Sequence, residues 1–191
     1  MNFAVITNVL VPNGIVSNYI LDNINVGDII EVLEPMGEFV LDKENFPNQV
    51  FLWAAVSDIS PIYSILNELL NSSPSAQIHL TYGNPTKEES IFLNQLIELS
   101  IKHKDRLTLY LFFTRESKIQ LENSFSGRIN SDFVKSYTLS CQNSLNSSMH
   151  FICGPSEMKE MVIESLEYIS VPRENIFSED ALNIVKSNFK I

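Results

Sequence analysis

The feature that most constrains this fold is a regular alternation of apolar runs and helical patterns from residue 50 onward. Four runs of strand length are rich in β-branched and aromatic residues, namely VFLWAAV, QIHLTYG, LTLYLFFT and MHFICG. Apolar residues recur at helical spacing in the segments beside them, residues 61–71, 87–102 and 155–169. Runs this apolar are typical of strands buried on both faces. The pattern therefore predicts an α/β fold with a parallel sheet flanked by helices.

The ends of these strands are the expected place for a ligand, because parallel sheets bind ligands beyond the carboxyl ends of their strands. The segments that follow the four runs are SDISP, YGN, TRE and CGP. In the last of them, Gly154 permits a tight turn, Pro155 suits the first position of a helix, and Glu157 lies in the first turn. Any well-capped junction of strand and helix could have this form, so each segment is weak evidence by itself.

The N-terminal part of the chain has a different sequence pattern. Residues 1–41 read as short strands separated by turns, with a possible helical turn at IVSNYILDN. The polar segment 42–48 contains a proline and is the best candidate for a domain boundary. We therefore expect two domains, residues 1–45 and residues 46–191.

Charge and composition argue against several classes of function. A net charge of -10 is unsuited to a general nucleic-acid-binding protein, which needs clustered Lys and Arg. Cys141 and Cys153 are too few for an iron–sulfur cluster, and the scattered His79, His103 and His150 do not suggest a metal site. The sequence has no apolar run of about 18 residues or more and no signal-peptide pattern, so we expect a cytoplasmic protein without a membrane span.

Seven segments in order resemble the ferredoxin–NADP reductase superfamily, and within it the phenylacetate-degradation and phthalate-dioxygenase types of reductase. The segments are GIVSNYI, VGDIIEVLEPMGEFVL, FLWAAVSDISPIYSIL, HLTYGNPTKEESIFLNQL, LFFTRES, GRI and FICGPSEMKEMVIESL. The resemblance implies a partial FAD-binding antiparallel β-barrel followed by an NAD(P)H-binding α/β domain of the ferredoxin reductase type. It also implies hydride transfer from NADPH or NADH to FAD, and single electrons passing on to an iron–sulfur or haem acceptor protein.

The resemblance implies a set of flavin-binding residues in the N-terminal domain. Gly14 and Ser17 match the motif that holds the FAD pyrophosphate through a backbone amide and a hydroxyl. Pro35, Gly37 and Phe39 match the pair of strands that closes the barrel.

A second set is implied for the nicotinamide nucleotide. Thr114 and Arg115 match the Ser/Thr–Arg pair that grips the 2′-phosphate in NADPH-dependent relatives, and Cys153 matches a segment beside the nicotinamide ring. The residues expected to bind this cofactor are Ser57, Pro61, Tyr82, Gly83, Thr114, Arg115, Gly154 and Pro155. The two candidates for catalytic roles are Ser60 and Cys153.

The chain departs from the family pattern in its barrel. Family members usually have several strands before the GxxS segment, one of which anchors the flavin, whereas here GIVS begins at residue 14. A barrel that lacks strands has open edges that need covering. The chain could therefore be a piece of a longer protein, have its edge covered in a homo-oligomer, or bind no FAD.

The loop expected to bind the nucleotide also differs from the family pattern. The family pattern is close to Ala-Gly-Gly-Ser/Thr-Gly-Ile-Thr-Pro, and residues 54–61 read AAVSDISP, with every glycine replaced. Val56 would crowd the approach of a pyrophosphate, and Asp58 would bring a carboxylate near it. Like charges about 4 Å apart near a surface cost on the order of 1–4 kcal/mol. We therefore expect weakened binding of a dinucleotide.

Three functional hypotheses remain open at this point. The first is a flavin-linked NAD(P)H oxidoreductase component, and the second is a non-catalytic binding or assembly protein on a degenerate reductase scaffold. The third is a regulatory subunit that shares a flavin or pyrimidine-type ligand between chains. Two residues also have plain structural readings: Arg115 could form a surface salt bridge with Glu116 or Glu122, and Cys153 could be a thiol at the edge of the core.

Overall fold

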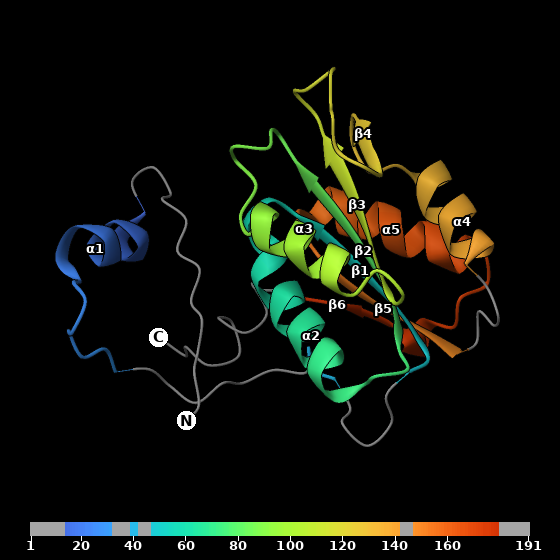
Figure 1. Cartoon of the computed structure of the whole chain (residues 1–191), viewed down its shortest axis with the longest axis horizontal. Coiled ribbons are helices and arrows are strands. Elements are labelled where there is room, and N and C mark those ends of the chain that lie inside the picture. The colour runs from blue at the N-terminus through green and yellow to red at the C-terminus, as the bar shows by residue number, and fades with distance from the viewer. Residues whose placement is uncertain (1–13, 32–38, 42–46, 142–146, 180–191) are drawn as a thin grey trace, which may run out of the picture. The chain divides into compact units, whose positions relative to one another are not determined.

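The computed structural model describes residues 14–31, 39–41, 47–141 and 147–179 (Figure 1). The chain divides into two compact units, Met1–Glu38 and Phe39–Ile191. In the first unit, the expected helical turn is a helix, α1 (Ile15–Asn23). Most of the predicted barrel strands, together with Pro35 and Gly37, lie outside the described residues, so the partial barrel and the boundary after residue 45 stay predictions.

The second unit is built on a six-stranded sheet in the order β4-β3-β2-β1-β5-β6. All neighbouring strands pair in parallel, which confirms the predicted fold class. The four strands predicted from the apolar runs form the centre of the sheet, and each observed boundary lies within one residue of the prediction. The strands are β1 (Gln49–Ala55), β2 (Gln77–Asn84), β3 (Leu107–Phe113), β4 (Ser124–Ser126), β5 (Ser148–Cys153) and β6 (Ile176–Ser178).

Helices cover both faces of the sheet (Figure 1). Because side chains alternate along a strand, Leu52 packs with α2 (Ile59–Ser72) and α3 (Leu93–Lys102), whereas Trp53 packs with α4 (Ser131–Ser140) and α5 (Ser156–Tyr168). Two hydrophobic cores result, one on each side of the sheet. None of the helices among the described residues has the length and apolar character that crossing a membrane requires.

The predicted helix 87–102 begins six residues later than expected, at Leu93. Phe92, just before it, has a left-handed backbone conformation with φ of 60°, which a continuous right-handed helix cannot contain. The segment before Phe92 forms turns instead. Its polar side chains bond locally, as when Ser90 Oγ donates to the Thr86 carbonyl oxygen at 2.7 Å.

Two histidines lie in the core on either side of β1. His79 and His150 both pair in register with Phe51 and stack on its ring, with centroid distances of 4.6 and 4.7 Å. Burial lowers the pKa of His79 to about 4 and, with the nearby His79, that of His150 to about 3. The expectation that the histidines are scattered is wrong for this pair, because β2 and β5 both pair with β1 and bring the two histidines to Phe51.

Candidate functional site

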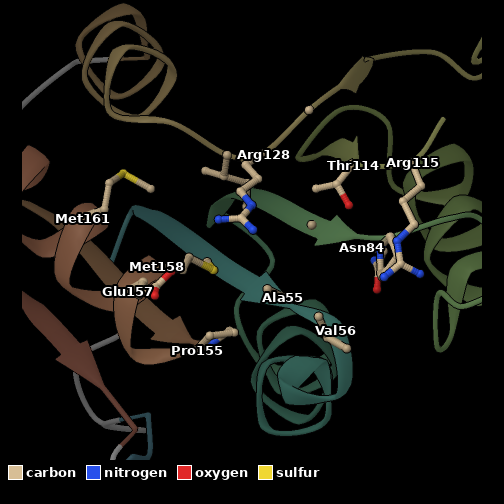
Figure 2. Close-up of a pocket in the computed structure, with 14 residues that line it drawn as sticks. Ala55, Val56, Asn84, Thr114, Arg115, Arg128, Pro155, Glu157, Met158 and Met161 are labelled. Carbon is tan, nitrogen blue, oxygen red and sulfur yellow. The ribbon is translucent and has the colours of Figure 1, made fainter. Parts of the chain in front are cut away.

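A pocket of about 520 Å³ lies at the carboxyl edge of the sheet, where the sequence predicts a ligand (Figure 2). Residues at and just beyond the ends of β1, β2 and β3 form its floor and one wall, and the loop before α4 and the first turns of α5 form the other wall. The lining residues are Ala55, Val56, Gly83, Asn84, Pro85, Thr114, Arg115, Gly127, Arg128, Ile129, Pro155, Glu157, Met158 and Met161.

The structure brings four of the residues expected to bind nucleotide to this pocket, and these are Gly83, Thr114, Arg115 and Pro155. Ser57, Ser60, Pro61, Tyr82, Cys153 and Gly154 lie in the adjoining elements without lining it. Among the residues expected to bind flavin, Gly14 and Ser17 belong to the first compact unit. Phe39 belongs to the second, where its ring packs edge-on against Phe151 with centroids 5.5 Å apart.

The glycine-free loop keeps a backbone conformation that favours glycine. Val56 has φ of 54°, which is rare for a β-branched residue and costs on the order of 1–3 kcal/mol. The Tyr82 hydroxyl donates a hydrogen bond to the Val56 carbonyl oxygen at 2.9 Å and so helps to hold the loop in place. The Val56 side chain lines the pocket, as expected from the sequence, and is 42% exposed.

The Arg115 side chain is 70% exposed at the rim of the pocket and pairs with Glu89, with 3.5 Å between Nη1 and Oε1. The alternative pairing with Glu116 or Glu122 is therefore wrong. Glu116 instead binds Lys87, through both its backbone amide and its ammonium group. A salt bridge this exposed is weak, so Arg115 can exchange Glu89 for a stronger anion.

A second arginine, Arg128, lines the pocket on the opposite wall, and in Figure 2 its guanidinium points into the space above Ala55. The GRI segment stood out in the sequence, but no role was assigned to its arginine. Its place in the sequence could have indicated a role, because a cation in a loop that returns to the carboxyl edge of a parallel sheet is well placed to bind an anionic ligand. The pocket thus offers two cations in a protein whose net charge is -10.

Cys153 is engaged with a carboxylate that the sequence pattern did not reveal. Its Sγ donates a hydrogen bond to Glu179 Oε2 at 3.0 Å, and Lys159 Nζ donates to the Glu179 backbone oxygen at 2.7 Å. Burial, reinforced by Glu179, raises the pKa of the Cys153 thiol far above its ordinary value. Cys153 therefore keeps its proton at neutral pH and is unsuited to act as a nucleophile.

Asp58 and Ser60 begin helix α2 and do not line the pocket. Burial and then Glu179 raise the pKa of Asp58, while a hydrogen bond from Ser57 and the charge of Lys159 oppose the rise. The Ser60 hydroxyl donates to the Ser57 carbonyl oxygen at 3.3 Å and so closes the turn into the helix. The Asp58 carboxyl is thus electrostatically coupled to the Cys153–Glu179 pair.

Two glycines allow the elements around the pocket to approach one another. A Cβ atom on Gly83 would lie 3.3 Å from Ile129 Cδ1, and one on Gly154 would lie 2.8 Å from Met158 Sδ. The neighbouring side chains would have to move in both cases. The ends of β2 and β3 are also held together, because Thr114 N donates to the Asn84 backbone oxygen at 3.0 Å and Arg115 N donates to that of Pro85 at 2.9 Å.

The domain that carries this pocket matches a family of known proteins. Residues 54–164 match the model of the oxidoreductase NAD-binding domain. The chain is 30% identical to a component of the 1,2-phenylacetyl-CoA epoxidase of Escherichia coli (strain K12), over 88% of this chain and 47% of that protein. It is 28% identical to the ferredoxin reductase component of 3-ketosteroid-9-alpha-monooxygenase from Rhodococcus rhodochrous, over 87% of this chain and 43% of that one. The chain thus spans about half the length of these relatives.

Solved structures agree on the fold. The CS-b5R domains of human Ncb5or, in the NAD+ form, superpose with a TM-score of 0.75 at 27% identity, covering 88% of this chain and 46% of that one. A ferredoxin NADP+ reductase from Neisseria gonorrhoeae with bound FAD and NADP gives 0.69 at 20% identity, covering 89% and 71%. Since the family model covers more than half of the sequence, the chain belongs to the oxidoreductase NAD-binding domain family.

Proposed function

We propose that this chain is the NAD(P)H-binding part of a flavin-linked oxidoreductase, in which hydride passes from NADPH or NADH to FAD and electrons pass on to a one-electron acceptor protein. The observation that carries the proposal is a pocket with two arginines at the carboxyl ends of parallel strands, in a chain of this family. Relatives that are reductases or reductase components support it.

The pocket fits a phosphorylated dinucleotide in size and charge. A volume of about 520 Å³ lies within the range of small-molecule and cofactor sites. We assign the 2′-phosphate of NADPH to Thr114 and Arg115, which offer a hydroxyl and a guanidinium at one end of the pocket. Arg128 is then available to the pyrophosphate, where its charge compensates for the lost glycines of the loop.

The flavin assignment rests on Gly14 and Ser17. Gly14 is the N-cap of α1 and Ser17 lies in the first turn, so backbone N–H groups and a hydroxyl meet at the positive end of a helix. Helix N-termini of this kind bind phosphate groups, which fits the FAD pyrophosphate. When bound, the flavin supplies the capacity to accept hydride and to release electrons singly.

The chain's own contribution at the nicotinamide end is to hold a proton and exclude water. Cys153 keeps its thiol proton on Sγ and directs it to Glu179, and Lys159 anchors Glu179 through its backbone. We propose that both residues act from beside the pocket, Cys153 by bonding Glu179 and Ser60 by shaping the turn into α2. Met158 and Pro155 supply the apolar wall that shields this end from solvent.

The acceptor, the assembly and the cellular location belong to the proposal as well. Relatives include a ferredoxin reductase component and flavohemoproteins, so both iron–sulfur and haem acceptors are consistent with the family. A homo-oligomer and a cytoplasmic location stay predictions. Cys141 and Cys153 are both free thiols, as is usual in a reducing compartment. The non-catalytic hypothesis is less well supported, because the pocket keeps two arginines in its lining.

A spectroscopic titration tests the proposal. The purified chain is mixed with FAD, freed of unbound flavin and titrated anaerobically with NADPH. A retained flavin band that bleaches as NADPH is added is the expected result. Absence of bound flavin, together with no response of Trp53 fluorescence to NADPH or NADH, would refute the proposed function.

Replacing Arg115 is expected to separate the two nicotinamide cofactors. In Arg115→Ala, loss of a charged hydrogen bond worth about 1.5–3 kcal/mol should weaken NADPH binding by about tenfold or more. The affinity for NADH, which has no 2′-phosphate, should change less than about twofold. Dissociation constants from Trp53 fluorescence or calorimetry give the comparison.

Glu89 provides the matched control for this experiment. Glu89→Gln frees Arg115 from its salt bridge and should tighten NADPH binding a few-fold, since exposed pairs are worth about 0–1 kcal/mol. Equal losses of NADPH and NADH affinity in Arg115→Ala would remove the 2′-phosphate role from Arg115.

A further inference from the structure

Asn84 has a buried amide without hydrogen bonds at the floor of the pocket. The residue is 3% exposed and lines the pocket, and neither Oδ1 nor Nδ2 has a partner within the part of the chain that the structure describes. Buried polar side chains are nearly always hydrogen-bonded, because an unsatisfied group bears the full cost of its desolvation. An unpaired amide beside a cavity therefore indicates a ligand that completes its bonds.

The neighbours of Asn84 do not need its amide to hold the structure. Burial raises the pKa of Tyr82 to about 12, and a side-chain interaction with Asn84 partly offsets the rise. The Tyr82 hydroxyl nevertheless donates its hydrogen bond to the Val56 carbonyl oxygen at 2.9 Å, and neither polar atom of the Asn84 amide lies within hydrogen-bonding geometry of it. Thr114 N bonds the backbone oxygen of Asn84, so the main chain alone joins the ends of β2 and β3. The side-chain amide is left for another partner.

The position of Asn84 selects which part of a dinucleotide it meets. It ends β2, next to the strand end that carries Thr114 and Arg115, and Figure 2 shows these three residues at the same end of the pocket. If Arg115 takes the 2′-phosphate, the adenosine that carries this phosphate lies at that end. This step rests on the proposed function.

The chemistry of an asparagine amide suits adenosine. Its oxygen accepts and its nitrogen donates, so it can pair with the N6 and N7 atoms of adenine in a bidentate manner or with a ribose hydroxyl. We propose that Asn84 binds the adenosine half of the nicotinamide dinucleotide and thereby determines specificity for it. The nicotinamide half makes no contact with Asn84.

The substitution Asn84→Leu tests this assignment, because leucine has nearly the same size and no polar atoms. The expected result is a melting temperature equal to or above that of the wild type, combined with at least a tenfold loss of affinity for NADPH and for 2′-phospho-AMP. Binding of nicotinamide mononucleotide should not change. Asn94→Leu, on the exposed part of α3, is the matched control and should leave all three affinities unchanged.

Two further measurements make the outcome decisive. A dinucleotide with hypoxanthine in place of adenine distinguishes the base from the ribose, since only a contact with the adenine N6 is lost. Asn84→Ser, with a smaller polar side chain, reports on binding if the leucine variant fails to fold. Unchanged affinity for NADPH and 2′-phospho-AMP in these variants would overturn the assignment to Asn84. Wild-type protein that binds no NADPH would instead refute the proposed function itself.

Discussion

Acidification from pH 7 to about pH 4 is expected to lower the free energy of unfolding by several kcal/mol, because two buried histidines must be protonated on unfolding. Burial lowers the pKa of His79 from 6.5 to about 4 and that of His150 from 6.5 to about 3. Below pH 6.5 the unfolded chain therefore binds more protons than the folded one, and stability falls as the pH falls. At about 1.4 kcal/mol per pKa unit, each histidine contributes on the order of 3 kcal/mol.

The environment of the pair explains why folding keeps both rings neutral. The His79 ring bonds the Tyr137 hydroxyl at 2.7 Å and lies 3.2 Å from Gln49 Nε2. The His150 ring accepts from Trp53 Nε1 at 3.4 Å and contacts Ser148 Oγ at 3.1 Å. These partners are uncharged, and Phe51 lies between the two rings, so nothing in this cluster compensates for a buried positive charge.

Urea denaturation monitored by Trp53 fluorescence at a series of pH values measures the effect. His79→Gln removes one titrating group but keeps a polar side chain, and it should make stability depend less steeply on pH between 6.5 and 4. His103→Gln is the control, because His103 lies at the end of α3 outside both cores. An equally steep pH dependence in the His79 variant would mean that His79 does not contribute to the acid transition.

Val56→Gly is expected to raise both stability and nucleotide affinity, an unusual combination for a residue of a binding pocket. Glycine adopts φ of 54° without strain, so the variant should recover about 1 kcal/mol after the entropic cost of glycine in the unfolded chain is subtracted. Removing a branched side chain from the pocket also lets a pyrophosphate approach the backbone. We expect NADPH to bind about tenfold more tightly, equivalent to about 1.4 kcal/mol.

Val56→Ala separates these two effects, since alanine reduces the bulk but keeps a Cβ atom at positive φ. It should gain affinity without gaining stability. Asp58→Gly should have the smaller effect on binding, because Asp58 does not line the pocket. Lower stability of Val56→Gly in urea denaturation would show that Val56 is not strained. NADPH affinity equal to that of the wild type would show that the loop does not face the nucleotide.

The central sheet could be predicted because its signals are local. Strands such as β1 and β5 are continuous apolar runs, and helix α2 has an apolar face at regular spacing, so each was visible in a short stretch of sequence. Helix α4 was missed because it buries only Val134 and Thr138, and its other apolar residues are few among polar ones. Tertiary contacts with α5 and the Asn130 cap stabilise it instead, as Asn130 Oδ1 accepts from Phe133 N.

The site was predictable to the extent that it consists of strand ends. Thr114 and Pro155 could be placed at the site because they come just after the ends of β3 and β5. Glu179 could not be placed, because it contacts Cys153 only where the chain returns beside β5 after α5. The alternative reading of Arg115 was a salt bridge with Glu116 or Glu122, which are close to it in the sequence, but the turn before α3 brings Glu89 to it. The segment YGN placed Asn84 at the end of a strand, but the lack of hydrogen-bond partners for its side-chain amide appears only in the folded chain.

The shortness of β4 and β6 has a consequence for assembly. Each border strand of the sheet has three residues, so among the described residues it offers only a short row of amide and carbonyl groups to a second chain. An unpaired edge strand is a template for pairing with another chain and for aggregation, and border strands this short offer little surface for such pairing. Within the described part of the second unit, helices and loops therefore offer a second copy of the chain more surface than the two border strands do.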